Sequence, residues 1–371
     1  MPRWWPRRRG WPNSGSGRCP RGCCFSDPTP LGDPRGLFFG ATVQAAQPKA
    51  QAGLMLDAAR QGAQAGMMLS AGLKHAFEAK LIMSSNGYGG YTRSSYCEVN
   101  ASARTGSGRG SGWAWAGTED ARRVDVAAAA GRAMDLAARG ESPVAVEPGR
   151  YTVIIEPEAL AQLLFMILRA DTTSVMSARA AERGGVVFSN PEGGTRIGER
   201  MADPRVQFLY DPADPLMPFS PLNPMAMMRR TEWLRDGVLV NLMFDSHYAD
   251  QHKLPVIPQP MKARLEIKGP TQTLEEMIAG TRRGIWIHRF SDPVLIDSPS
   301  LLLGGVTRDG TFLIEKGKVT RPVKNMRFSE SPFYILSRLD AFGVPQRASE
   351  RITCPRIRAH DFEFTALSDA I

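Results

Sequence analysis

Histidine is scarce in this sequence of 371 residues, which contains only His75, His247, His252, His288 and His360. No two of these histidines are four residues apart. The helical zinc motif of many hydrolases needs two histidines at that spacing, with a glutamate directly after the first. The sequence therefore excludes this common zinc motif.

Cysteine is equally scarce, because three of the five lie in the first 40 residues and only Cys97 and Cys354 remain. Two distant cysteines form neither a disulfide framework nor a CxxC zinc site. We expect both to be buried small residues rather than catalytic thiols. The GxSxG nucleophile motif and the GxxxxGK[ST] phosphate loop are also absent. The residues alone thus identify no catalytic residue.

Long hydrophobic runs are missing as well. The best run, at 159–168, is interrupted by Gln162 and followed by Arg169, whereas a membrane-spanning helix needs about 20 apolar residues. The short apolar stretch at 36–43 does not match a secretory signal. We therefore expect no membrane partner and a cytoplasmic location.

Positive charge is in excess, with a net charge of +9. Residues 1–40 contain seven arginines and two aspartates, together with many prolines, glycines and tryptophans. Arginines interleaved with tryptophans could bind a nucleic acid, but this low-complexity composition is more typical of disorder. We interpret 1–48 as a disordered basic tail or a wrongly assigned start of translation. Nucleic acid is accordingly not an expected partner.

The remaining chain predicts an α+β protein of two domains. The first, 49–140, begins with a helix over 49–71. Antiparallel strands follow around a turn at Asn86–Gly87, and a short strand carries Trp113 and Trp115. A helix with Thr118 as its N-cap then closes this domain near Gly140.

A proline-containing linker leads to the second domain, 149–371. A strand at 151–155 precedes a long helix from Pro157 to about Ala181. The rest is β-rich, with hairpin turns at Asp236–Gly237 and Lys316–Gly317 and a capping box at Thr273 and Glu276. Asp309–Gly310 and Glu330–Ser331 have the composition of turns and caps. Hairpin connections favour an antiparallel sheet or a partly closed barrel with flanking helices.

One polar stretch could carry chemistry. Asp245, His247, Asp250 and His252 lie close together in the sequence, and such a group could ligate a metal or act as acid and base. We interpret the stretch as an exposed polar loop. His247, His252 and Cys354 remain the fallback metal ligands, and an independent hydrolase using Asp245, His247 and His252 remains an alternative function.

Five segments in order resemble the TldD/PmbA family, whose members are grouped with metallopeptidases and described as modulators of DNA gyrase. They are GRYTVIIEPEALAQLL at 149–164, IGERMADPRV at 197–206, RRTEWLRDGVL at 229–239, TLEEMIAGTRRGIWIHRF at 273–290 and TRDGTFLIEKGKVTRPVKNMRFSESP at 307–332. NGYGGYTRSS and GSGWA in the first domain resemble it more weakly. Residues 1–48 have no counterpart.

The resemblance implies that TldD-like members carry HExxxH on the helix after the first strand of the second domain. PmbA-like members, also called TldE, lack it and pair with the TldD-like kind. Here the corresponding helix contains no histidine or glutamate from 159 to 175. The resemblance also implies that a later cysteine, in a Gly-Cys-Gly-like stretch, completes the zinc site of TldD-like members, and Cys354 does not lie in such a stretch. The resemblance therefore indicates a non-catalytic subunit without a cofactor of its own, which helps to enclose the active site of a zinc-containing, TldD-like partner.

The same resemblance implies a peptide substrate. Strands at 229–244 and 284–290 are candidate sheet edges to which a peptide could add, but no single peptide-binding residue is assigned. A nucleic-acid-binding or gyrase-associated protein that works through the basic tail is a further alternative function.

Overall fold

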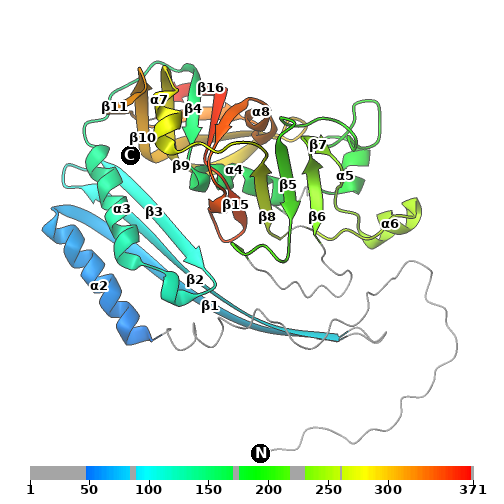
Figure 1. Cartoon of the computed structure of the whole chain (residues 1–371), viewed down its shortest axis with the longest axis horizontal. Helices are drawn as coiled ribbons and strands as arrows, with labels where there is room; N and C mark the ends of the chain where they lie inside the picture. The colour runs from blue at the N-terminus through cyan, green and yellow to red at the C-terminus, as the bar shows by residue number, and fades with distance from the viewer. Residues whose placement is uncertain (1–46, 84–88, 170–174, 218–229, 260, 369–371) are drawn as a thin grey trace, which may run out of the picture.

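The computed structural model describes residues 47–83, 89–169, 175–217, 230–259 and 261–368. The predicted tail at 1–48, apart from its last two residues, and the predicted turn at Asn86–Gly87 lie outside this part of the chain. The described segments fold into two units (Figure 1).

The first unit is a three-stranded antiparallel sheet covered on one face by two helices. Its elements are α2 (Pro48–Gln64), β1 (Met67–Met83), β2 (Gly89–Thr105), β3 (Ser111–Thr118), the 3-10 turn η2 (Ala121–Arg123) and α3 (Val126–Arg139), with strand order β1-β2-β3. The far ends of β1 and β2 extend well beyond the helices (Figure 1). Small alanines of α3 pack on the sheet, and Gly112 of β3 allows close contact, since a Cβ there would lie 2.1 Å from the Ala133 oxygen.

Two predicted boundaries in this unit are wrong. The first helix ends at Gln64 rather than 71, because Gly66 adopts a φ of +64° and turns the chain into β1. Thr118 ends β3 and does not cap a helix. Asp125 is the N-cap of α3, and its side chain accepts a hydrogen bond from the Ala128 N–H at 2.9 Å.

The second unit is built around a closed five-stranded barrel. β4 (Gly149–Ile155), β9 (Arg283–Asp297), β10 (Leu302–Glu315), β12 (Met326–Glu330) and β16 (Ile357–Leu367) form it, each strand pairing with the next and β16 pairing with β4. Only β4 and β9 are parallel. Phe290, Phe328, Phe362 and Phe364 pack together in its core. The barrel confirms the predicted β-rich fold and is fully rather than partly closed.

A second sheet lies beside the barrel. Its order is β14 (Gln346–Arg347), β15 (Ile352–Cys354), β8 (Ala263–Ile267), β5 (Val206–Tyr210), β6 (Thr231–Arg235) and β7 (Val238–Leu239). The flanking elements are α4 (Pro157–Leu168), α5 (Ala178–Arg183), α6 (Ser246–His252), α7 (Leu274–Ala279), α8 (Pro332–Ser337), β11 (Lys318–Pro322) and β13 (Leu339–Phe342). No helix in the described ranges is long and apolar enough to cross a membrane.

Short-range turn and cap signals in this unit are confirmed. Asp236–Gly237 joins β6 to β7 with both φ values positive, and Lys316–Gly317 joins β10 to β11 in the same way. The Thr273 side chain and Glu276 form the reciprocal capping box of α7.

Three other predictions for the second unit are wrong. The helix from Pro157 ends at Leu168, and a separate short helix, α5, follows from Ala178. Asp309–Gly310 is not a turn but a bulge inside β10. The 284–290 segment is not a free sheet edge, because β9 pairs with β10 throughout and with β4 over 284–287.

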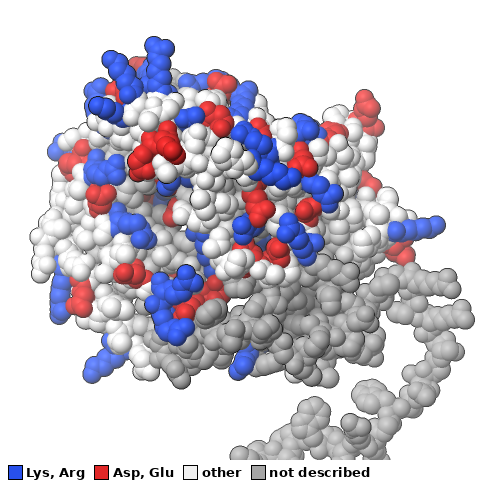
Figure 2. Space-filling view, viewed as in Figure 1, with Lys and Arg blue, Asp and Glu red and all other residues white. Residues whose placement is uncertain are grey.

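Lys and Arg side chains are interspersed with Asp and Glu over much of the face that Figure 2 shows. Several basic side chains gather at the top of that view, over β11. Lys318 and Arg321 of β11 and Lys316 in the turn before it are exposed, and Arg321 lies 3.8 Å from Glu315. This face is therefore mixed in charge rather than one continuous basic surface.

Candidate functional site

Helix α4 takes the position at which the family resemblance implies a zinc motif, and it is a core helix. Leu160, Leu163, Leu164 and Ile167 are buried in the main hydrophobic core. The Gln162 side chain accepts a hydrogen bond from the Phe290 N–H at 2.9 Å, which ties the helix to β9. Within the described ranges, no group of three or more His, Cys, Asp or Glu side chains gathers where a metal ion could be held.

The 245–252 stretch is helix α6 and not a loop, so the prediction of a polar loop is wrong. Asp245 is its N-cap, accepting a hydrogen bond from the Tyr248 N–H at 2.8 Å and one from Arg179 at 3.1 Å. His252 stacks on Tyr248, whereas His247 and Asp250 are exposed. Because Asp245 already stabilises the helix start, these residues do not converge on one site.

Cys97 and Cys354 are buried thiols, as predicted. Cys354 lies in β15, and its Sγ donates to the Pro157 oxygen at 3.3 Å. Burial raises the pKa of Cys354 well above its ordinary value, and burial likewise raises the pKa of Cys97 to about 11. Thiols with raised pKa values are poor nucleophiles and poor metal ligands at neutral pH.

One cavity lies between the two units and is lined by two side chains with strongly shifted pKa values, Glu158 and His288. Its volume is about 790 Å³, within the range of small-ligand pockets. The first unit contributes side chains from β3 and α3, and the second contributes α4, β9 and the β15–β16 connection. Its prominent lining residues are Trp113, Trp115, Trp286, Glu156, Glu158 and His288.

Glu156 anchors the second unit's side of this interdomain cavity. It precedes α4, and its N–H donates to the Ile287 oxygen at 2.9 Å. Its carboxylate accepts the Trp286 Nε1–H at 2.6 Å and both the Nε and Nη2 of Arg356 at 2.7 Å. The two bonds from Arg356 and the bond from Trp286 fill most of the hydrogen-bonding capacity of the Glu156 carboxylate. The bond to the indole also fixes the position of the Trp286 ring.

Glu158, two residues further on, lacks such a partner. Within the described chain it forms no ion pair with another residue, and it lines the same cavity. Burial, with a smaller contribution from the Glu156 carboxylate, raises the pKa of Glu158 to about 7. A hydrogen bond from its own backbone N–H and the charges of Arg132 and Arg356 oppose this shift. A carboxyl group that titrates near neutral pH is typical of functional sites.

His288 faces the cavity from β9. It lies opposite the β10 bulge, where a Cβ on Gly310 would approach the imidazole to 3.1 Å. Its Nε2 is buried and has no hydrogen-bond partner. Because burial disfavours the charged ring, the pKa of His288 is lowered to about 4, so the imidazole is neutral at physiological pH.

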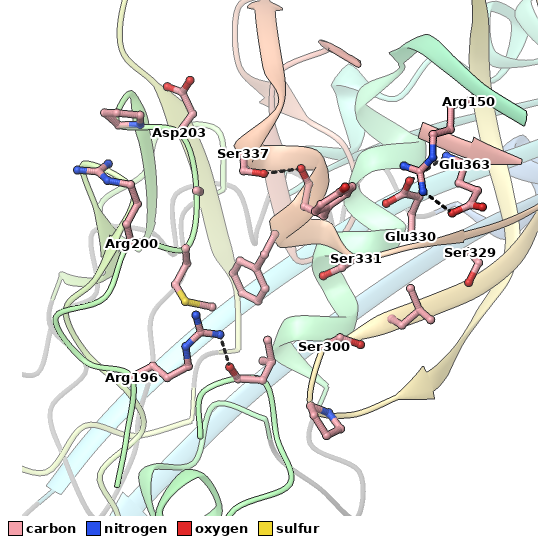
Figure 3. A pocket seen from close by; sticks show the side chains of 18 residues that line it. Arg150, Arg196, Arg200, Asp203, Ser300, Ser329, Glu330, Ser331, Ser337 and Glu363 are labelled. Atoms are coloured by element: carbon pink, nitrogen blue, oxygen red, sulfur yellow. Dashed lines mark hydrogen bonds and ion pairs between the residues drawn. The ribbon is translucent and has the colours of Figure 1, made fainter. Parts of the chain in front are cut away.

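A second concave surface lies between α8, the 196–204 segment and residues of β4, β10, β12 and β16, and is drawn in Figure 3. Its volume is about 740 Å³, and it is lined by Arg150, Arg196, Ser300, Glu330, Tyr334 and Glu363. Arg150 bonds to Glu363 at 3.0 Å, and Glu330 accepts the Glu363 N–H at 2.8 Å (Figure 3). Burial raises the pKa of Glu330 to about 7. The charged groups here are largely paired with one another.

The C-terminal unit, with its closed barrel and apolar α4, is matched by a family model. The model, described as the PmbA/TldA metallopeptidase C-terminal domain, covers residues 148–366. The chain therefore belongs to the PmbA/TldD family. A comparison with curated protein sequences finds no match.

Solved structures share the fold at low sequence identity. A proposed modulator of DNA gyrase from Bacteroides thetaiotaomicron has a TM-score of 0.73 at 19% identity, covering 88% of this chain and 74% of its own. One from Thermotoga maritima has a TM-score of 0.74 at 16% identity, covering 87% and 76%. TldE from Thermococcus kodakarensis has a TM-score of 0.68 at 14% identity, covering 84% and 72%.

Sequence reasoning did not single out Glu156, Glu158 or His288. Glu156 and Glu158 flank Pro157 at a helix start, a position typical of ordinary helix signals. His288 alternates with apolar residues in a strand and resembles a core residue. The three are brought together only because β4 and β9 pair in parallel, with Ile155 opposite Ile287.

Proposed function

We propose that this chain is the non-catalytic, PmbA/TldE-type subunit of a zinc metallopeptidase that acts on peptides. The observation that carries the proposal is the character of α4, which buries apolar side chains where a zinc helix would present histidines and a glutamate. Membership of the family and the shared fold with a TldE structure support it.

The chemistry of zinc explains why this helix does not fit the metal. A catalytic zinc needs about three protein ligands, an open position for water and a nearby base. The side chains at 165–168 are Phe, Met, Ile and Leu, and none of them provides a nitrogen, an oxygen or a thiolate. Zinc and the group that activates its water therefore come from the partner.

One edge strand is suited to contact a peptide or the partner. β1 is an outer strand of the first sheet. The outer side of β7 is already occupied, because the Leu239 N–H donates to the Glu199 oxygen and the Leu239 oxygen accepts the Gly198 N–H. A free edge can add one further strand through main-chain hydrogen bonds. The predicted edge at 229–244 is therefore not free at β7, and β1 replaces both it and the one at 284–290.

The test is to express the chain alone and together with an HExxxH-containing member of its family from the same genome. Size-exclusion chromatography with light scattering measures pairing, and elemental mass spectrometry measures zinc after dialysis against a weak chelator. We expect less than about a tenth of an equivalent of zinc in the single chain and about one equivalent in the pair. Cleavage of an unfolded protein should require the pair.

Zinc near one equivalent in the chain alone, or peptide cleavage by it, would contradict the proposal. In that case a His247→Ala/His252→Ala variant tests the alternative hydrolase, since loss of zinc would assign it to α6. Among the described residues no contact favours that alternative, because Asp245 already caps the helix.

A further inference from the structure

We propose that the interdomain cavity binds a peptide through a primary ammonium group, with the Glu158 carboxylate and the His288 Nε2 as its acceptors. Neither the family match nor the proposed subunit role assigns a ligand to this cavity. The inference stands on the geometry of this chain and does not require pairing with a zinc peptidase.

The hydrogen-bonding groups of the cavity determine the charge of the ligand. Each lining arginine already has an acceptor within the chain: Arg356 has Glu156, Arg347 has Glu119, Arg139 lies 3.6 Å from Asp135, and Arg132 donates to the Trp115 oxygen. In the described chain, the Glu158 carboxylate accepts from its own backbone N–H but from no other residue, and the His288 Nε2 has no partner. The unmet requirement is therefore for a donor with positive charge.

His288 is suited to accept rather than donate. A neutral imidazole with its proton on Nδ1 presents Nε2 as an acceptor. The burial of His288, together with Arg139 and Arg356 nearby, keeps the ring neutral, although Glu156 and Asp135 act in the opposite sense. A buried acceptor without a partner is unfavourable, so a bound N–H donor would remove that penalty.

The tryptophans make the cavity suitable for the apolar part of a peptide. Arg289 lies over the Trp113 ring at 4.5 Å, and Arg139 lies over the Trp286 ring at 5.2 Å. These arginines hold the two rings in place as cavity walls. A short peptide can thus place its ammonium between the two acceptors and its apolar side chains against the indoles.

The titration of Glu158 predicts how binding responds to pH. A cation favours the ionised carboxylate, and Glu156, Arg132 and Arg356 are the charged groups that face Glu158. Between pH 5.5 and 7.0 the ionised fraction of a group with a pKa of about 7 rises about tenfold or more, while peptide ammonium groups remain mostly protonated. Affinity should rise by about the same factor.

The experiment is isothermal titration calorimetry on the full chain with three probes. Trialanine carries an α-ammonium, Nα-acetyl-trialanine carries none, and Nα-acetyl-lysine amide carries only a side-chain ammonium. Binding of trialanine alone identifies the peptide N-terminus as the ligand, and binding of the lysine probe identifies a lysine side chain. If neither ammonium probe binds, or if the acetylated peptide binds as tightly as trialanine, the inference is wrong.

Variants locate the binding within the cavity. Glu158→Gln should lower the affinity for the ammonium probe by about tenfold or more at pH 7.0. It should also abolish the increase of affinity with pH, while the exposed control Glu192→Gln should change neither the affinity nor its pH dependence. His288→Phe provides a second test if Glu158→Gln misfolds by circular dichroism. Unchanged affinity in a folded variant of either residue would overturn the assignment. Zinc content and pairing do not depend on Glu158, so this inference and the proposed function can fail separately.

Discussion

The Glu119 carboxylate accepts a hydrogen bond from the Arg347 guanidinium, and this ion pair joins the two units beside the interdomain cavity. Glu119 follows β3, and Arg347 belongs to β14, 228 residues later. The Lys262 ammonium lies 3.7 Å from the same carboxylate, and all three side chains are largely buried. The Glu119 carboxylate thus pairs with two cations at the contact between the units.

Glu119→Gln should therefore loosen this contact. The change removes the carboxylate charge that pairs with the buried Arg347 and Lys262 side chains, and loss of one partner of a buried ion pair costs about 3–5 kcal/mol. Urea unfolding followed by circular dichroism measures the loss, and limited proteolysis of the 140–148 connection reports separation of the units. The exposed substitution Glu192→Gln is the control, and equal stability of the two variants would contradict the prediction.

Glu330 should make stability fall as pH rises. Its pKa is raised by burial from 4.5 to about 7, so the folded state keeps its proton through a range in which the unfolded state releases it. The stabilisation is complete below about pH 4.5 and is lost by about pH 7.

Glu330→Gln removes this dependence, so the variant should gain up to roughly 3 kcal/mol relative to the wild type between pH 4.5 and 8. Urea unfolding at several pH values measures the difference. Glu158 titrates in the same direction, so a smaller slope should persist in the variant. Parallel curves for variant and wild type would show that Glu330 ionises normally.

Gly112 should tolerate no larger side chain. A Cβ at this position would lie 2.1 Å from the Ala133 oxygen and 2.6 Å from the Ala137 nitrogen, so alanine would force α3 away from β3. Overpacking of this kind typically costs about 1–3 kcal/mol. Gly131→Ala is the matched control, because nothing lies within 4 Å of its added Cβ and alanine favours a helix. Thermal unfolding should show a lower Tm for the first variant and an unchanged or higher Tm for the second.

The features predicted correctly from sequence depend on neighbouring residues. Asp236–Gly237, Lys316–Gly317 and the Thr273–Glu276 box follow from turn and cap chemistry over two to four positions. The two hairpin turns predict a β-rich second unit, and the absence of HExxxH is visible in the sequence itself.

The interdomain cavity could not be predicted in this way. Glu156 and Trp286 are 130 residues apart in sequence and meet through the parallel pairing of β4 with β9. Burial, which depends on both units, sets the pKa of Glu158 and of His288. Asp309–Gly310 resembles a turn in the sequence because β-bulges and tight turns both favour residues that adopt positive φ.

The Glu156–Arg356 pair offers a test of how the cavity wall is held. Arg356→Met leaves the Glu156 carboxylate buried without its guanidinium and should destabilise the fold by about 3–5 kcal/mol. It should also disturb the hydrogen bond between Glu156 and the Trp286 indole, so the tryptophan fluorescence of the folded protein should change.

The double variant Glu156→Gln/Arg356→Met distinguishes a specific pair from general packing. Gln removes the uncompensated charge while its amide oxygen can still accept the Trp286 N–H, so the double variant should be more stable than Arg356→Met alone. A double-mutant cycle at pH 7 measures this coupling. Additive effects of the two substitutions would mean that Arg356 supports the wall through its side-chain packing and not through the charge of Glu156.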